Sequence, residues 1–504
     1  MMSPPIQGTW LGARGARLLL LLLATLGVAG TLWWWSQQSD ARGGPIVLIS
    51  IDTLRADHLA LYGYKAVATP AIDALARDGV TFDRAYTHSP QTLPSHTSML
   101  TGRLPFQHGV RDNVGFEVKA KERLLPGLLR DHGYVSGGFV SAYVLRRATG
   151  ISQGFDVYDD NLPAASPEAS IGQVQRDGAL TVAAAHRWVA ERQDPRFFVF
   201  LHLYEPHKPY APPPRFSQYE PYDGEIAYAD EIVGRFVNVL RAAGWYEKAT
   251  IVLLSDHGEG LGDHGEQEHG LFLYDDTIRV PLIVKLPREA RAGRRVPDPV
   301  QHLDLLPTLL DLAGAEIPRD LAGRSLRPLL EQEEPLRLRT GAIYAESLYS
   351  RYHFGWSELH SLTYGTHRYI KAPHEELYDL ERDPRETRNL AAHQPDTARN
   401  MRAALERIMA GSSVERPSTV SVEDQQKLQA LGYVATAQPV SEDVAANALA
   451  DPKDKVGILE NLRWRVHGCP RQTDLLCLAH DLLPRVTLQP VVKDLQEWRP
   501  VHRV

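Results

Sequence analysis

Cysteine is almost absent from this chain of 504 residues. The two that occur, Cys469 and Cys477, both lie in the C-terminal tail. The rest of the chain therefore uses no cysteine chemistry. Export from the cell would allow the two cysteines to form a disulfide, but their spacing alone does not show one.

An excess of positive charge is absent as well. The chain has 55 basic and 62 acidic residues, and a formal net charge of -7. A basic footprint is what a nucleic-acid-binding surface needs, so no nucleic acid partner is expected. The composition, 43% hydrophobic and 23% charged, is that of an ordinary globular protein.

A long uncharged run lies near the N-terminus. Arg14 and Arg17 precede residues 18–35, which carry no charge and end in three tryptophans. As a helix this run would span roughly 27 Å, close to a bilayer core of about 30 Å. The pattern predicts a single-pass inner-membrane anchor with the remaining chain on the periplasmic or extracellular side. The alternative is a cleaved signal peptide, since residues 28–30 are small enough for cleavage, and a secreted protein.

Apolar runs alternate with helical patterns along the following 270 residues or so. Runs at 45–51, 134–141, 197–203, 249–255 and 280–286 read as buried strands, and segments 225–243 and 302–313 as helices. Alternation of this kind predicts an α/β fold with a mainly parallel sheet and helices on both faces. Ligands bind beyond the carboxyl ends of such strands. Asp52, Glu205, His207, Asp256 and His257 directly follow three of the runs.

The composition divides the chain into four parts. Residues 1–44 form the anchor or signal segment and its linker, and residues 45–330 the α/β body. Residues 331–411 are expected to form a smaller C-terminal subdomain of that body. Residues 412–504 read as a linker and a short helical tail, with helices at 456–466 and 473–483. A lone helical hairpin needs a partner to bury its apolar face, so the tail is expected to contact another protein.

Seven motifs appear in a characteristic order between residues 45 and 391. They are IDTLRADHLALYGY, TLPSHTSMLTGR, LYEPHKPY, LLSDHGEGLGDHG, RVPLIV, HLDLLPTLLDLAG and ELYDLERDPRETRNL. In this order they resemble the sulfatase branch of the alkaline phosphatase superfamily. The resemblance implies an alkaline-phosphatase-like sandwich around the parallel sheet. It does not fix the reaction, because related members catalyse different ones. The last motif is expected to pack in the C-terminal subdomain and to contribute no catalytic group.

The resemblance also implies a bound divalent cation. Asp52, Asp256 and His257 match the family's metal ligands, and Thr92 stands at the position of the nucleophile beside the metal. Oxygen ligands with one imidazole suit Zn²⁺ or Mn²⁺. Calcium-dependent members more often have asparagine where His257 stands, which leaves Ca²⁺ as the less favoured alternative.

Thr92 departs from the sulfatase pattern. Sulfatases carry Cys-x-Pro-x-Arg at this point, and the cysteine matures to formylglycine; here Thr92 and His96 replace the cysteine and the arginine. Threonine does not form formylglycine. The stretch is similar to the Thr-x-Pro-x-His of nucleotide pyrophosphatase/phosphodiesterases, in which threonine attacks phosphorus. The Gly-Lys-x-His that contacts sulfate in sulfatases is also missing, since VSGGFVSAYV follows Tyr134.

Two further histidines are candidate catalytic residues. His207 matches the histidine of the family's Pro-His-x-Pro motif, near the leaving group. His269 lies twelve residues after His257, as in lipid phosphoethanolamine transferases, and could bind the phosphoryl group, bind a second metal or act as a general acid. Arg55, His96 and Lys208 are candidate contacts to substrate anions.

The sequence therefore predicts a metal-dependent hydrolase or phosphotransferase that acts on an anionic ester. The substrate would be a phosphate ester of the phosphodiester, phosphoethanolamine or phosphoglycerol type, carried by a lipid head group, a nucleotide or a glycan, with Thr92 as nucleophile. The alternatives are a sulfatase that works without formylglycine and a catalytically silent binding module.

Overall fold

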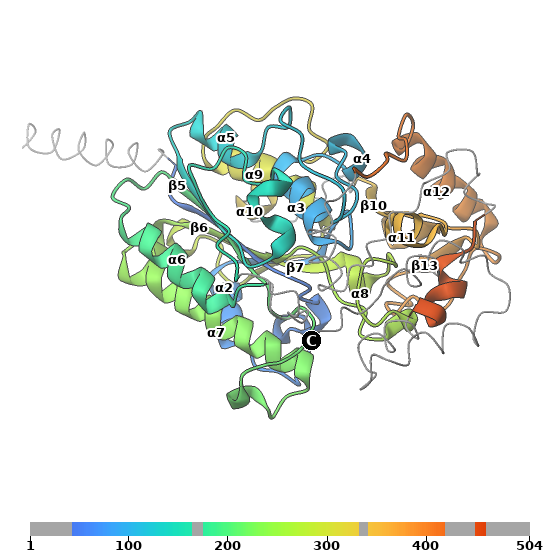
Figure 1. Ribbon diagram of the computed structural model, residues 1–504, viewed down its shortest axis with the longest axis horizontal. Coiled ribbons are helices and arrows are strands. Elements are labelled where there is room, and N and C mark those ends of the chain that lie inside the picture. The colour runs from blue at the N-terminus through green and yellow to red at the C-terminus, as the bar shows by residue number, and fades with distance from the viewer. Residues whose placement is uncertain (1–42, 164–174, 332–340, 419–448, 460–504) are drawn as a thin grey trace, which may run out of the picture.

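The residues IVLISI form β1 (Ile46–Ile51), an interior strand of a nine-stranded sheet. The computed structural model describes residues 43–163, 175–331, 341–418 and 449–459 (Figure 1). Along the sheet the strand order is β4-β3-β5-β1-β6-β7-β2-β8, and β9 pairs with β2. The other strands are β2 (Val80–Tyr86), β3 (Val135–Phe139), β4 (Val157–Asp159), β5 (Phe197–Leu203), β6 (Thr250–Ser255), β7 (Arg279–Lys285), β8 (Arg294–Val296) and β9 (Val300–Gln301).

Most neighbouring strands of this sheet are parallel. The five strands from β4 to β6 all run in one direction. β7 is the exception, since it is antiparallel to both of its neighbours, β6 and β2. The strand order places β1 between β5 and β6, so three parallel strands end side by side in the middle of the sheet.

Alternate residues of β1 enter different hydrophobic cores. Ile46 and Leu48 pack on one face, whereas Val47, Ile49 and Ile51 pack on the other. Burying each such side chain contributes about 1.5–3 kcal/mol to stability. The first face is covered by α3 (Thr92–Thr101), α5 (Leu125–Arg130), α9 (Leu305–Leu312) and α10 (Arg327–Glu331), and the second by α2 (Pro70–Asp78), α6 (Gly178–Ala190) and α7 (Pro221–Ala242) (Figure 1).

A second, smaller sheet follows along the chain. Its four strands are antiparallel in the order β10-β11-β12-β13. Aromatic and aliphatic side chains of this sheet pack against the amphipathic helix α12. These elements are β10 (Ile343–Ser347), α11 (Tyr349–Phe354), β11 (Leu359–Tyr364), β12 (His367–Lys371), β13 (Glu376–Asp379) and α12 (Pro395–Ile408); the short helices α4 (Pro105–His108) and α8 (Asp275–Ile278) belong to the larger body.

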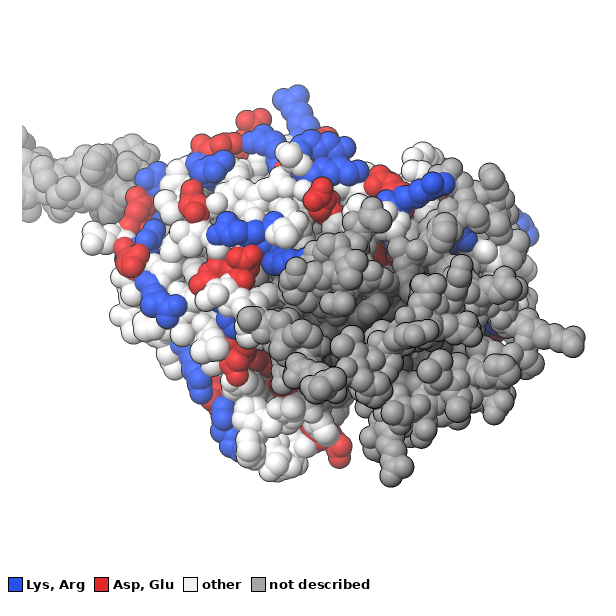
Figure 2. Space-filling view, viewed as in Figure 1, with Lys and Arg blue, Asp and Glu red and all other residues white. Residues whose placement is uncertain are grey.

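The predicted fold class is confirmed. A mainly parallel central sheet lies between two layers of helices, and a separate antiparallel sheet forms a C-terminal subdomain. On the face drawn in Figure 2, basic and acidic side chains of the described residues alternate over the α/β body.

The predicted membrane anchor is not supported. Among the residues that the structure describes, none of the helices has both the length and the apolar composition to cross a bilayer. The run at 18–35, which carried the prediction, lies outside those residues. The prediction of a single-pass inner-membrane protein, and of a membrane contact through that helix, is corrected accordingly. Cys469, Cys477 and the predicted tail helix at 473–483 also lie outside the described residues, whereas residues 452–459 are helical.

A buried ion-pair cluster joins the C-terminal subdomain to the body. Arg368 of β12 is fully buried; its Nη2 lies 2.7 Å from Asp275 Oδ1 at the start of α8, and its Nη1 lies 3.0 Å from Glu386 Oε1. Glu386 Oε2 also accepts a hydrogen bond of 2.6 Å from the Asp275 backbone nitrogen. The motif ELYDLERDPRETRNL thus contributes a structural link between the two parts.

Glu386 and Glu381 of this motif are expected to respond differently to substitution. Glu386→Ala removes one partner of the buried Arg368 and should lower the free energy of unfolding by about 3 kcal/mol. Glu381 is exposed, so Glu381→Ala should change the free energy by less than about 0.5 kcal/mol. Urea denaturation of the two variants measures the difference. Equal stabilities would mean that the cluster does not hold the subdomain.

Candidate active site

Two neighbouring strands, β1 and β6, lead into the candidate metal ligands, and β5 ends beside β1 at the same edge of the sheet. Ile51 of β1 lies opposite Leu203 of β5 and Ser255 of β6, and all three strands are parallel. The next residues, Asp52, Tyr204 and Asp256, therefore leave the sheet at the same edge. Asp52 donates its backbone N–H to the Leu203 carbonyl over 2.9 Å, which keeps this edge in register.

Asp52, Asp256 and His257 form a compact set of donor atoms. One atom from each side chain lies within 4.8 Å of the others. His257 Nε2 is 3.7 Å from Asp52 Oδ1 and 3.5 Å from Asp256 Oδ2. His257 Nδ1 donates to the Gly258 carbonyl over 2.9 Å, which fixes the tautomer and leaves the Nε2 lone pair toward the carboxylates.

These donors fit a divalent cation. All three side chains are fully buried. Both carboxylate oxygens of Asp52 and Oδ2 of Asp256 have no hydrogen-bond partner among the described residues. Buried charged oxygens without partners are costly unless a cation compensates for them. Two carboxylates and one imidazole are ligands that a divalent cation accepts.

The pKa shifts of these three side chains also favour a bound cation. Burial, together with the nearby charges of Asp256 and Glu259, raises the pKa of Asp52 well above its usual range. Burial also raises the pKa of Asp256 to about 6 and lowers the pKa of His257 to about 3. The imidazole is therefore neutral, as a metal ligand must be. The carboxylates are in an environment that disfavours their charge in the absence of a cation.

The hydroxyl of Thr92 lies beside this donor set. Thr92 is the first residue of α3, and its Oγ1 is 3.4 Å from His257 Nε2. The helix begins after the extended residue Gln91 and ends at Gly102, whose φ of 66° is the left-handed conformation that glycine adopts readily. All ten residues of α3 are buried. A helix N-terminus favours an anion at this point.

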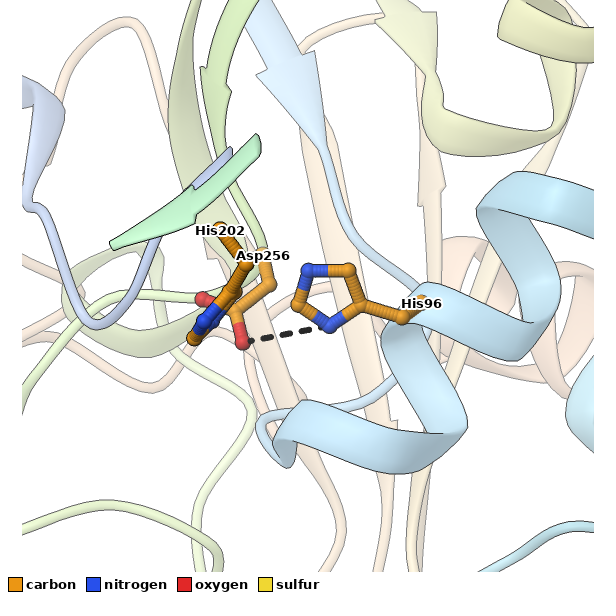
Figure 3. Close-up of side chains that lie close together, drawn as sticks. All are labelled: His96, His202 and Asp256. Carbon is orange, nitrogen blue, oxygen red and sulfur yellow. Dashed lines mark ion pairs between the residues drawn. The ribbon is translucent and has the colours of Figure 1, made fainter. Parts of the chain in front are cut away.

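His96 lies one turn after Thr92 and is fully buried. Its Nδ1 is 2.7 Å from the Thr92 carbonyl, and its Nε2 is 2.9 Å from Ser50 Oγ. Its Nδ1 also lies 3.7 Å from Asp256 Oδ2 (Figure 3). Both ring nitrogens thus contact protein atoms, and a contact of His96 with substrate stays a prediction.

His202 was not among the residues predicted from the sequence. It lies in β5 opposite Ser50 of β1, and its Nε2 is 3.5 Å from Asp52 Oδ2. Figure 3 shows His96, from α3, pointing toward Asp256 and His202, and the ring centroids of the two histidines are 5.0 Å apart. The three form a second group whose ligand atoms all lie within 4.8 Å of one another. The signal in the sequence is a single histidine within an otherwise apolar strand, two residues after Phe200.

His207 and His269 lie next to each other, and His269 also lies beside His257. Their ring centroids are 5.0 Å apart, and the ring of His269 is 4.4 Å from that of His257. His269 Nδ1 is 2.9 Å from Glu259 Oε1. Burial raises the pKa of Glu259 to about 7 and lowers the pKa of His207 to about 4.

The two candidate cations of the substrate site are already paired. Arg55 is buried; its Nη2 lies 2.7 Å from Asp57 Oδ2 and its Nη1 2.9 Å from Asp263 Oδ2. Lys208 Nζ lies 2.7 Å from Glu268 Oε1, and its side chain is 41% exposed. The structure thus brings Asp52, Thr92, Asp256 and His257 together with His96, and places the two cations in ion pairs around them.

The fold is an alkaline-phosphatase-like sandwich, with helices on both faces of a mainly parallel sheet. The family model for Sulfatase matches residues 45–315, more than half of the chain, and the chain therefore belongs to the sulfatase family. A second model, N-sulphoglucosamine sulphohydrolase, C-terminal, matches residues 262–412.

The sequence relatives are named as sulfatases, and the solved structures share the fold. An N-acetylglucosamine-6-O-sulfatase of Bacteroides thetaiotaomicron is 23% identical over 74% of this chain and 86% of its own. An arylsulfatase of Clostridium perfringens is 26% identical over 68% of this chain and 89% of its own. The crystal structure of a phosphonate monoester hydrolase of Agrobacterium radiobacter has a TM-score of 0.63 and 23% identity, and covers 73% of this chain and 96% of its own. A protein solved with its substrate D-glucosamine-2-N,6-O-disulfate has a TM-score of 0.64 and 20% identity, and covers 75% of this chain and 99% of its own.

Proposed function

We propose that this sulfatase-family hydrolase cleaves phosphate esters that carry a single negative charge, with Thr92 as nucleophile. Substrates of the phosphodiester type, including phosphoethanolamine and phosphoglycerol esters, belong to this class. Asp52, Thr92, Asp256 and His257 would hold a divalent cation, Zn²⁺ or Mn²⁺ in preference to Ca²⁺. Such a cation favours the alkoxide of a neighbouring hydroxyl, as it lowers the pKa of bound water.

The position of the Thr92 hydroxyl carries this proposal. The hydroxyl stands at the helix start, 3.4 Å from His257 Nε2. His257 in turn lies beside Asp52 and Asp256, three of whose carboxylate oxygens have no hydrogen-bond partner among the described residues. Sulfatases place a formylglycine there, which threonine does not form. Thr92, His96 and the segment VSGGFVSAYV replace three groups on the sulfate side, whereas the metal side is retained. A chain that had lost catalysis would be expected to lose metal ligands as well. Loss of the sulfate-side groups alone therefore favours a different reaction over an inactive protein.

The chain's own residues provide two displacements. Thr92 loses its proton to solvent, and its Oγ forms a bond to phosphorus as the bond from phosphorus to the leaving oxygen breaks. His269 donates a proton to that oxygen, and Glu259, at 2.9 Å from Nδ1, stabilises the protonated imidazole. His207 lies beside His269 and contacts the leaving group. Water then attacks phosphorus and the bond to Thr92 Oγ breaks. The water proton returns to His269, and Thr92 Oγ takes a proton back from solvent. Two inversions give retention at phosphorus.

A second candidate function is hydrolysis of sulfate esters without formylglycine. Two relatives described above are named as sulfatases, which favours this alternative. The natural substrate would then be a sulfated glycan or an aryl sulfate. The third alternative, a binding module without catalysis, requires no stoichiometric metal, so the metal content of the purified protein separates it from the other two.

The direct test compares a diaryl phosphate diester with an aryl sulfate that has the same leaving group. We expect the metal-loaded protein to hydrolyse the phosphodiester with the higher kcat/KM, by at least about tenfold. Both esters carry one negative charge, so the comparison reports the nucleophile rather than the charge of the substrate. A preference for the sulfate would exclude the phosphate assignment in favour of the second candidate.

A further inference from the structure

The C-terminal subdomain contacts the segment that leads into α3. The Glu346 backbone N–H of β10 donates to the His88 carbonyl over 3.0 Å, and His88 Nδ1 donates to the Tyr344 carbonyl over 2.6 Å. His88 is four residues before Thr92. The edge strand of the small sheet, β10, therefore lies along the segment that leads to Thr92, the proposed nucleophile.

The tripeptide Arg111-Asp112-Asn113 provides a second connection. The Arg111 guanidinium forms a paired contact with Glu346 of β10, with Nε–Oε1 and Nη2–Oε2 distances of 2.6 and 2.7 Å. His353 of α11 lies with Nε2 at 3.2 Å from both carboxylate oxygens of Asp112. All four side chains are nearly or fully buried, so these charge-assisted contacts are protected from water.

The other side of the same tripeptide holds both neighbours of Thr92. Gln91 Nε2 donates to Asp112 Oδ2 over 3.2 Å, and the Leu93 backbone N–H donates to Asn113 Oδ1 over 2.7 Å. Gln91, the N-cap residue of α3, makes no side-chain capping bond of its own. Asn113 thus satisfies an N–H of the first helical turn that would otherwise lack an acceptor.

We propose that Asp112 and His353 are positioning residues that fix the Thr92 hydroxyl in its attacking position. The proposal rests on the proposed function, since it assumes that Thr92 is the nucleophile. His353 orients the Asp112 carboxylate, Asp112 holds Gln91, and the adjacent Asn113 holds Leu93. The C-terminal subdomain, which donates no group to the reacting atoms, thereby sets the position of the catalytic turn. A displacement of a reacting group by 1 Å can cost about a hundredfold in rate.

Two substitutions at position 353 separate this role from packing. His353→Gln keeps an N–H donor for Asp112 but loses the ring, whereas His353→Phe keeps a ring against Tyr349 (centroids 4.4 Å apart for the histidine) but loses the donor. We expect His353→Phe to lower kcat for bis(4-nitrophenyl) phosphate by about ten- to a hundredfold with little change in KM. The kcat of His353→Gln should stay within about threefold of the wild-type value, because glutamine keeps a donor for Asp112.

The matched control is Tyr352→Phe, on the same helix. It removes one part-buried hydrogen bond, from Tyr352 Oη to the Glu415 carbonyl at 3.0 Å, and leaves the contacts of Asp112 with His353 and Gln91 in place. Its kcat should equal that of wild type. Metal content is measured for every variant, so that a change in kcat is compared at equal metal loading.

The outcomes are distinct. If Thr92→Ala retains wild-type turnover, the proposed function fails and the positioning role fails with it. If Thr92→Ala is inactive but His353→Phe turns over as fast as His353→Gln, the proposed function stands and the positioning role is refuted. Should His353→Phe not fold, Gln91→Met removes the bond to Asp112 from the other side, and the same loss of kcat relative to Tyr352→Phe is required.

Discussion

Thr92→Ala is expected to lower kcat/KM for an aryl phosphodiester by more than about a thousandfold, which corresponds to about 4 kcal/mol of the barrier. The reason is that the substitution removes the Oγ1 that lies 3.4 Å from His257 Nε2, and with it the covalent route. Thr92→Ser keeps a hydroxyl at the helix start and should retain part of the activity. Steady-state kinetics at fixed metal concentration measure both, and acid-quenched wild-type enzyme should carry a phosphoryl ester on Thr92 in its peptide mass spectrum.

The control for this series is Thr101→Ala, at the other end of α3. Thr101 is buried and donates its hydroxyl to the Thr97 carbonyl over 2.6 Å, far along the helix from the donor set. Its loss should affect stability and leave turnover almost unchanged. Full phosphodiesterase activity in Thr92→Ala would mean that water attacks directly.

Thr92→Cys restores the Cys-x-Pro of the family but leaves His96 at the arginine position. Because maturation to formylglycine generally requires Cys-x-Pro-x-Arg, this variant should gain no sulfatase activity. His96 is also buried against Ser50 and the Thr92 carbonyl, so an arginine there would have to displace these contacts.

Asp256→Ala is expected to abolish metal binding and activity while the protein stays folded. Asp256 supplies one of the three buried carboxylate oxygens without a hydrogen-bond partner in the donor set. Removing it should also relieve the unfavourable proximity of two buried carboxylates, Asp52 and Asp256. Wild type should gain about 2.7 kcal/mol of stability at a metal concentration one hundred times the Kd, whereas the variant should gain none.

The thermal shift with and without Zn²⁺ or Mn²⁺ provides this readout independently of activity. Asp230→Asn is the matched control, since Asp230 is a buried aspartate that accepts the backbone N–H groups of Ala71 and Ile72 and lies outside the site. Its metal-dependent shift should equal that of wild type. Full metal occupancy in Asp256→Ala would remove Asp256 from the ligand set.

Several elements could be predicted because they depend on local patterns. The runs 45–51 and 197–203, predicted as buried strands, match β1 and β5. β2 was not predicted, because its sequence VTFDRAY includes Asp83 and Arg84 and lacks a continuous apolar run. The antiparallel direction of β7 was not predicted either, since an apolar run has no direction until it pairs with its neighbours.

The candidate site shows the same division. The sequence by itself determined which polar residues follow β1, β5 and β6, because strand ends are encoded by neighbouring residues. Only the tertiary structure decided that His202 lies beside Asp52, since a histidine within an apolar strand is compatible with an ordinary core position. It also decided that His353 contacts Asp112, although the two are 241 positions apart. Contacts of this range depend on how the small sheet packs on the large one, and that packing is a sum of many weak, distant interactions that no local pattern contains.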